Sequence, residues 1–221
     1  MQISVGVVVF PGSNCEYDVC EALELVGAIP RLVWHNESNL GDVRGLVIPG
    51  GFAHGDYLRP GAIAKFSRVM EAVIKFAKDG RPVLGICNGF QILTEAGLLP
   101  GALQKNAGLR FICRPELVSI STRDCVITSE LAVGSMLSLP INHFEGNYTC
   151  DKATLDELLQ DDRVVMRYEH NPNGSIDSIA AIANQSKNVV GMMPHPERAC
   201  DDLLGSTHGL PIFRSLLEAA K

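Results

Sequence analysis

The chain has 221 residues, of which 46% are hydrophobic and 20% charged, the composition of a soluble globular protein with one large or two small domains. A formal net charge of −6 without a basic cluster argues against a nucleic-acid partner. No apolar run approaches the roughly twenty residues that cross a membrane, and residues 3–10 lack the features of a secretory signal. Seven cysteines without a C-x-x-C pair indicate reduced thiols in a cytoplasmic protein.

The first half of the chain alternates short apolar runs, which predict buried strands, with amphipathic segments that predict helices. Ser13 or Asn14 is the expected cap of the first helix, and glycines end the helices. In chain order we expect strand 3–10, a helix to about 27, strands 31–35 and 45–49, loop 52–61, helix 62–79, strand 83–86, and a helix to about 97. This order predicts an α/β fold: a three-layer, mostly parallel open sheet with helices on both faces.

The second half reads differently, because its first predicted strands have no helix between them. This pattern predicts added antiparallel strands. A capping-box pattern that begins at Thr154 opens a short helix to about residue 160. The expected strands are 109–121, 125–128, 164–168, 178–183 and 189–193, and helix 210–220 closes the chain. Without a flexible linker or repeat, we expect a single domain over residues 1–221.

Cys87 lies on the turn between strand 83–86 and the helix that follows it. Gly85 and Gly89 flank it in the pattern G-x-C-x-G, a thiol version of the nucleophile elbow. Such a sharp turn leaves no room for neighbouring Cβ atoms. The helix start favours thiolate over thiol, and the amide of Asn88 can face a developing oxyanion. The pattern predicts a catalytic nucleophile, with a buried structural cysteine as the alternative.

A histidine with a nearby acid follows the last predicted strand. His195 lies between two prolines that stiffen the backbone, and Glu197 is close enough in sequence to orient its imidazole. Open α/β sheets bind ligands beyond the carboxyl ends of their strands, so His195 is the expected partner of Cys87. Gly51, after the third strand, can supply a second amide to an oxyanion hole.

Other histidines remain open as partners for Cys87, and His143 and His54 are the most serious of them. The sequence has no H-x-x-x-H, no H-E-x-x-H and no cysteine pair, so no metal site is expected. It also has no G-x-G-x-x-G and no Walker A loop, so no nucleotide site of its own is expected. Arg198 is interpreted as a solvated surface charge.

Several separate motifs, spread from residue 5 to 198, carry a family resemblance. The segments 49–51, 85–91 and 194–197 together resemble the class I, triad-type glutamine amidotransferases, whose fold is flavodoxin-like. The longer segments 49–59, 87–103, 171–175 and 193–198 resemble the glutaminase subunits of phosphoribosylformylglycinamidine synthases. The family pattern has a small residue and a glycine around the histidine of loop 140–146, where this chain has Asn142 and Phe144.

The resemblance implies that the chain hydrolyses glutamine to glutamate and ammonia through a cysteine thioester. It implies these roles: nucleophile Cys87, base His195, orienting acid Glu197, oxyanion amides of Gly51 and Asn88, and a glutamine contact from Gln91. The ammonia would pass to an ATP-dependent synthetase subunit, which converts formylglycinamide ribonucleotide to formylglycinamidine ribonucleotide in de novo purine biosynthesis. A small accessory subunit is also implied. ATP and Mg²⁺ would belong to the synthetase, with no cofactor in this chain.

Two other classes of function stay open at this point. A cysteine hydrolase of similar fold could use the same elbow on a peptide or γ-glutamyl substrate, without any partner. A flavodoxin-like binding module could use segment 11–14 as a phosphate loop. The first would not account for the Gly-Phe-x-x-Gly-Asp-Tyr segment at 51–57, and the second would be favoured by a yellow chromophore.

Overall fold

The strands predicted in the first half of the chain form the parallel side of one large sheet. The computed structural model describes residues 2–221. Its nine-stranded sheet has the order β2-β1-β3-β4-β11-β10-β9-β6-β7. Strands β2, β1, β3, β4 and β11 run parallel, and each of the pairs from β11 to β7 is antiparallel. The parallel strands are β1 (Ser4–Val9), β2 (Ile29–Trp34), β3 (Gly45–Ile48), β4 (Val83–Ile86) and β11 (Val189–Met192).

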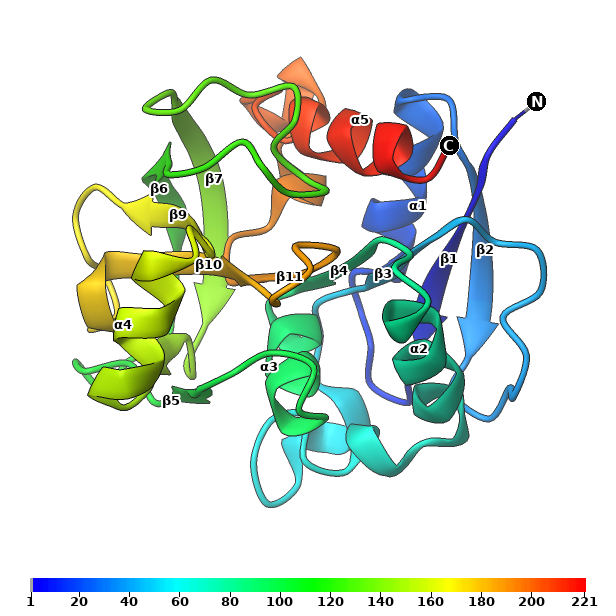
Figure 1. Ribbon diagram of the computed structural model, residues 1–221, viewed down its shortest axis with the longest axis horizontal. Coiled ribbons are helices and arrows are strands. Elements are labelled where there is room, and N and C mark those ends of the chain that lie inside the picture. Colours follow the sequence, from blue (N-terminus) through cyan, green and yellow to red (C-terminus); the bar gives the residue numbers. More distant parts are fainter. Residues whose placement is uncertain (1) are drawn as a thin grey trace.

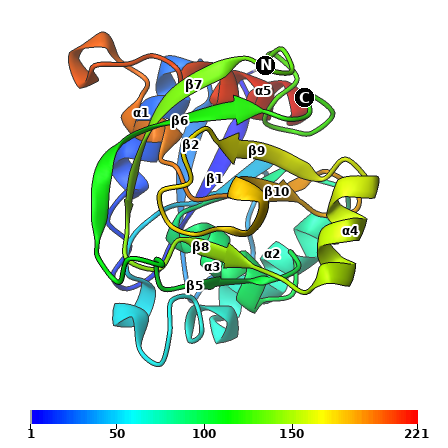
Figure 2. The same cartoon turned by 90° about the vertical axis from the view of Figure 1, so that its left-hand side faces the viewer.

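The antiparallel half comes from the middle of the chain. It consists of β6 (Ile112–Ile120), β7 (Met136–His143), β9 (Val164–Tyr168) and β10 (Ile179–Ala183). A separate two-stranded ribbon pairs β5 (Ala102–Gln104) with β8 (Asn147–Thr149). Figure 2 shows this ribbon in front of helix α3, with α4 beside β9 and β10. The fold is thus the expected α/β sheet with antiparallel strands in its second half.

Helices cover both faces of the parallel half, as the strand and helix order predicted. Figure 1 shows α1 and α5 on one face and α2 and α3 on the other. The helices are α1 (Glu16–Leu25), α2 (Arg68–Lys78), α3 (Asn88–Glu95), α4 (Lys152–Gln160) and α5 (Leu210–Ala219). Every residue of β3 and β4 is buried, which explains why these strands read as continuous apolar runs.

Several expected elements were wrong. Residues 125–128 form turns, in which Thr128 N donates to Cys125 O at 3.3 Å, and are not a strand. Strand β7 was missed because it contains Pro140, which interrupts a strand pattern; β7 lies at the edge of the sheet, where a proline is tolerated. The short strands β5 and β8 were also missed, since three residues give too little alternation to detect.

Three helix starts also differ from expectation. The helix expected at 62–79 is broken at Ser67, which is extended (φ −63°, ψ 143°), and only α2 is α-helical. Neither Ser13 nor Asn14 caps α1: Cys15 is at the cap position, and the Ser13 hydroxyl accepts from Phe10 N instead. Helix α4 is capped by Asp151, three residues before the residue that the capping-box pattern selected, because its carboxylate accepts from the Thr154 amide at 2.8 Å.

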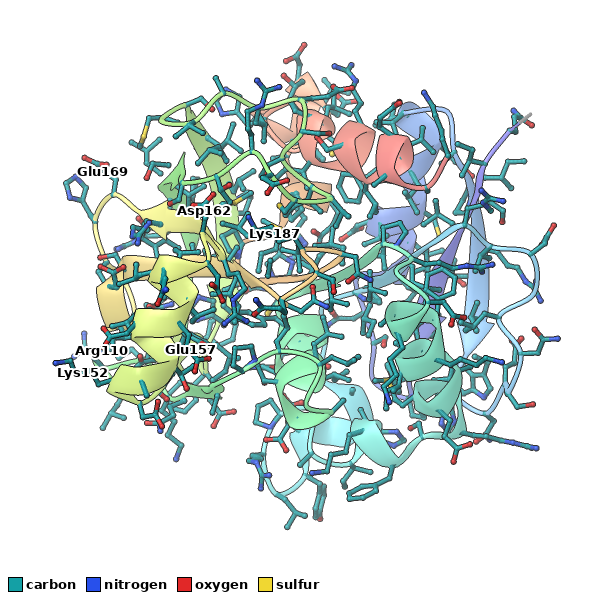
Figure 3. The ribbon with its side chains drawn as sticks, viewed as in Figure 1. Arg110, Lys152, Glu157, Asp162, Glu169 and Lys187 are labelled. Carbon is teal, nitrogen blue, oxygen red and sulfur yellow. The ribbon has the colours of Figure 1, made fainter. Side chains whose placement is uncertain are left out.

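Charged side chains join the loops at the antiparallel end of the sheet. Lys187, in the turn between β10 and β11, lies 2.8 Å from Asp124 and 4.0 Å from Asp162. Figure 3 labels Lys187 and Asp162 on neighbouring loops.

Among residues 2–221, no helix combines the length and the apolarity that crossing a membrane requires.

Candidate active site

Cys87 occupies a strained turn between β4 and α3. Its backbone has φ 51° and ψ −103°, a region that side-chain-bearing residues rarely adopt outside functional sites. A Cβ at Gly89 would lie 2.0 Å from the Ile48 carbonyl oxygen, and one at Gly85 would lie 2.7 Å from Gly89. Only glycines therefore let α3 pack this closely against the sheet. The turn presents a thiol that is 6% exposed at the start of a helix.

His195 and Glu197 form a buried pair at the end of β11. Nδ1 of His195 lies 2.6 Å from Oε1 of Glu197, and their side chains are 2% and 0% exposed. Because Nδ1 contacts the carboxylate, Nε2 is left to face a reacting group, and it has no hydrogen-bond partner within the described chain. Pro196 begins the short 3₁₀ helix Pro196–Arg198, which fixes the spacing of the pair.

The charge balance around His195 favours the imidazolium. Burial alone lowers the pKa of His195, but the adjacent charges of Glu197 and of the Cys87 thiolate raise it well above its ordinary value. The arrangement of Cys87, His195 and Glu197 therefore matches a nucleophile, a base and an orienting acid.

The backbone amides of Asn88 and Gly51 lie at the sheet edge that carries Cys87. Asn88 is the first residue of α3, so its N–H has no partner within the helix. Gly51, with φ 146°, forms an isolated β-bridge with Ser13. The two hydrogen bonds of this bridge run from Phe52 N to Gly12 O and from Asn14 N to Gly50 O, so they do not use the N–H of Gly51. Ile48 and Ile86, the last residues of β3 and β4, place both amides at the same sheet edge.

Gln91 lies one helical turn beyond Cys87 and points into the same cavity. This cavity has a volume of about 420 Å³, including its open mouth. Its walls include Gly51, Asp56, Cys87, Gln91, His143, Glu145 and His195. The Gln91 amide is held at both ends, since Oε1 accepts from Asn88 Nδ2 at 2.9 Å and Nε2 donates to Glu145 O at 2.7 Å.

Neither rival histidine is placed to act as the base. His54 Nε2 lies 3.2 Å from Ser67 Oγ, and its ring packs against His35, away from the cavity wall. His143 does line the cavity, but burial and the charge of His195 lower its pKa to about 4. Its Nδ1 also lies 3.1 Å from Asn106 Oδ1. A histidine with so low a pKa is a poor general base near neutral pH.

Sequence reasoning missed two side chains that pack behind His195. Cys15, taken as incidental, is 1% exposed, and its Sγ lies with ligand-type atoms of His195 and Glu197 in a group within 4.8 Å. Arg198 was wrongly interpreted as a solvated charge: it is half-buried, donates to Cys15 Sγ at 3.1 Å, and pairs with Asp18 at 3.3 Å. The signal for Cys15 was its position just after the first strand, at the same sheet edge.

The comparisons with known proteins agree with this geometry. Residues 2–209 match the model of the CobB/CobQ-like glutamine amidotransferase domain. The chain is 55% identical over 217 residues to phosphoribosylformylglycinamidine synthase subunit PurQ of Rubrobacter xylanophilus, covering 98% of this chain and 99% of that protein. It is 54% identical over 224 residues to the same-named subunit of Koribacter versatilis, covering 97% of each.

A solved structure is also similar over its whole length. A chain of the structure of PurLQS from Thermotoga maritima superposes with a TM-score of 0.93 at 40% identity, with 100% of both chains covered. Fold, elbow and sequence match define a glutamine amidotransferase. Within that class, the chain belongs to the family of PurQ subunits of phosphoribosylformylglycinamidine synthase.

Proposed function

We propose that Cys87, His195 and Glu197 carry out the glutaminase reaction of a PurQ subunit in purine biosynthesis. The observation that carries the assignment is the buried contact of 2.6 Å between His195 Nδ1 and Glu197 Oε1, at the edge of the cavity that contains the Cys87 thiol. This contact fixes the imidazole with Nε2 free, as proton transfer to and from a thiol and an amine requires.

The reaction follows from these positions. Cys87 Sγ attacks the side-chain carbonyl carbon of glutamine, and the oxyanion is stabilised by the amides of Gly51 and Asn88. His195 donates its proton to the departing nitrogen, so that the C–N bond breaks and ammonia leaves a γ-glutamyl thioester. Water, deprotonated by His195, then attacks the thioester and releases glutamate and the Cys87 thiol. Glu197 keeps the imidazolium oriented in both steps.

The ammonia is used by a second subunit. A PurQ subunit acts with the synthetase subunit PurL and the accessory PurS, the assembly named for the Thermotoga structure. We infer that ATP and Mg²⁺ bind to the synthetase, that this chain holds no cofactor, and that the complex is cytoplasmic. We also infer that residues 1–221 act as one amidotransferase domain, which is supported by the hydrophobic core that the parallel and antiparallel strands share.

Protein atoms occupy the space beside the loop that a flavin-binding protein would use to hold a phosphate. Segment 11–14 packs against the loop after β3: Phe52 N donates to Gly12 O at 2.8 Å, and a Cβ at Gly12 would lie 2.2 Å from Phe52 O. This contact leaves little room for a phosphate. The flavodoxin-like alternative therefore has no support in the geometry.

Covalent labelling tests the proposed function directly. A glutamine analogue with an electrophilic carbon in place of the amide should inactivate the wild-type chain and label Cys87 alone. Peptide mapping that places the label on Cys15, the neighbouring buried thiol, would overturn the assignment.

A further inference from the structure

The cavity beside Cys87 has an acidic wall that the hydrolysis steps above do not use. Asp56 ends the short helix Ala53–Asp56 that follows β3, and Glu145 lies in the turn between β7 and β8. Both line the cavity together with Cys87 and Gln91. Within residues 2–221, neither carboxylate forms an ion pair with a lysine or an arginine. Their negative charges are therefore uncompensated by the chain itself.

Hydrogen bonds hold this wall in position next to the nucleophile. Asn88 Nδ2 donates to Asp56 Oδ1 at 3.2 Å and to Gln91 Oε1 at 2.9 Å. Gln91 Nε2 donates to the Glu145 carbonyl oxygen at 2.7 Å. The side chains that bridge Asp56 and Glu145 thus belong to α3, the helix that starts at Cys87. The two carboxylates repel each other: burial and the charge of Glu145 raise the pKa of Asp56 to about 6.

A third acceptor in the same cavity comes from His143. Asn106 Oδ1 accepts from the Gly146 amide at 3.1 Å and lies 3.1 Å from Nδ1 of His143, so Nδ1 carries the proton. The low pKa keeps the ring neutral, and Nε2 is then a lone-pair acceptor. His143 is 3% exposed, and its Nε2 has no hydrogen-bond partner in the described chain. Two carboxylates and an unpartnered imidazole nitrogen call for a cationic N–H donor.

We propose that Asp56 and Glu145, with Nε2 of His143, form the subsite for the α-ammonium group of glutamine, a proposal that rests on the glutaminase function above. Two methylene groups separate the amide carbon of glutamine from its α-carbon. Once the amide carbon is at Cys87, the α-ammonium group must therefore lie within the same small cavity. An ammonium there satisfies all three acceptors and relieves the repulsion between the carboxylates. The subsite would make Asp56 and Glu145 determinants of specificity for an α-amino acid amide.

Comparison of two substrates tests this subsite. Glutaramate is glutamine without its α-amino group and keeps the same reacting amide. In the assembled complex, Asp56→Asn and Glu145→Gln should each raise KM for glutamine roughly tenfold or more, as expected for the loss of a charge-assisted hydrogen bond. The value of kcat should change little, because the reacting groups are untouched. KM for glutaramate should stay unchanged or fall, so discrimination between the two substrates should shrink.

Glu95→Gln is the matched control. Glu95 pairs with Arg59 at 2.5 Å and thereby tethers the same loop as Asp56, but it does not line the cavity. Any effect of loosening the loop should therefore appear equally with both substrates in this variant. The α-ammonium subsite is overturned if Asp56→Asn and Glu145→Gln weaken both substrates equally, or neither. It is also overturned if they change only the stimulation by the synthetase, since the acids would then bind a cation of the partner.

The proposed function is judged separately from the subsite. Wild-type glutamate release and its loss in Cys87→Ser report on the glutaminase reaction whatever the two acid variants do. If Asp56→Asn does not fold, Glu145→Gln alone decides the subsite, because the carboxylate of Glu145 forms no hydrogen bond or ion pair within the described chain, and only its backbone carbonyl contacts Gln91.

Discussion

His195 Nδ1 and Glu197 Oε1 are 2.6 Å apart inside the protein, and the second carboxylate oxygen of Glu197 has no hydrogen-bond partner among the described residues. The carboxylate of Glu197 therefore makes its side-chain hydrogen bond with His195. Since the charge of Glu197 raises the pKa of His195, its removal should lower that pKa as well as free the ring. The two effects distinguish an orienting acid from a merely structural one.

The roles of these two residues should separate on substitution. We expect His195→Ala to approach the background of Cys87→Ser, whereas Glu197→Gln should retain measurable activity, about 10²- to 10⁴-fold below wild type in kcat. The pH profile of kcat should also move in Glu197→Gln, because loss of the Glu197 charge lowers the pKa of His195. Full activity in His195→Ala would contradict this assignment and mean that another residue is the general base.

Only one of the seven cysteines should be essential for glutamine hydrolysis. Cys87→Ser should abolish glutamate release, because an alcohol at this position is far less ionised than a thiol. Cys113 is exposed and is not among the residues that line the cavity, so Cys113→Ser should keep wild-type kcat and KM. An inactive Cys113→Ser protein that is folded by circular dichroism would contradict this expectation.

The elbow should tolerate no side chain at Gly89. In Gly89→Ala the new Cβ would meet the Ile48 carbonyl oxygen, so α3 must move away from the sheet or the chain must unfold. We expect thermal unfolding to show a destabilisation of about 1–3 kcal/mol or more, together with loss of activity. Gly108→Ala is the matched control, since a Cβ there has open space. An equally stable and active Gly89→Ala would mean that the packing of α3 is not tight.

Asp56 should destabilise the protein at neutral pH. Its pKa rises from 3.8 to about 6. Burial and the charge of Glu145 both raise this pKa, and together they outweigh the hydrogen bond from Asn88, which lowers it. The folded state therefore holds this proton more tightly than the unfolded state, and stability contributed by the neutral form is lost as pH rises through about 6. Asp56→Asn should raise Tm at pH 7.5 but hardly at pH 4. Asp42→Asn, at an exposed carboxylate, is the control.

Much of this site followed from local sequence signals, while its surroundings did not. Gly85, Gly89 and two prolines act within a few residues of Cys87 and His195, so the elbow and the stiff histidine loop could be predicted from spacing alone. The packing of Cys15 and Arg198 behind His195 joins segments about 180 residues apart, and no local pattern encodes it. Pro140 interrupts the strand pattern of β7, so neither this strand nor the turn after it, which carries Glu145, was predicted. These parts of the site depend on contacts between distant segments, which the hydrophobic periodicity of the sequence does not encode.

The loop after β3 should make catalysis depend on the synthetase. This loop follows Gly51, and His54, Asp56 and Leu58 all have positive φ, which costs backbone strain. Tyr57 and Leu58 are 74% and 87% exposed, so their apolar surface is available to a docking subunit. Arg59, held by Glu95, anchors the far end of the loop on α3. A partner that covers this surface can therefore shift both Gly51 and Asp56.

We accordingly expect weak glutaminase activity from the isolated chain and a large rise in kcat on addition of the synthetase, the accessory subunit and their nucleotide ligands. The measurement is glutamate release at saturating glutamine, with and without the partners. Leu58→Asp should reduce this stimulation, because a charge on the docking surface is costly to bury. It should leave the basal rate of the isolated chain unchanged, since Leu58 does not line the cavity. An isolated chain as fast as the complex would mean that the oxyanion hole is already formed and that this loop is no switch.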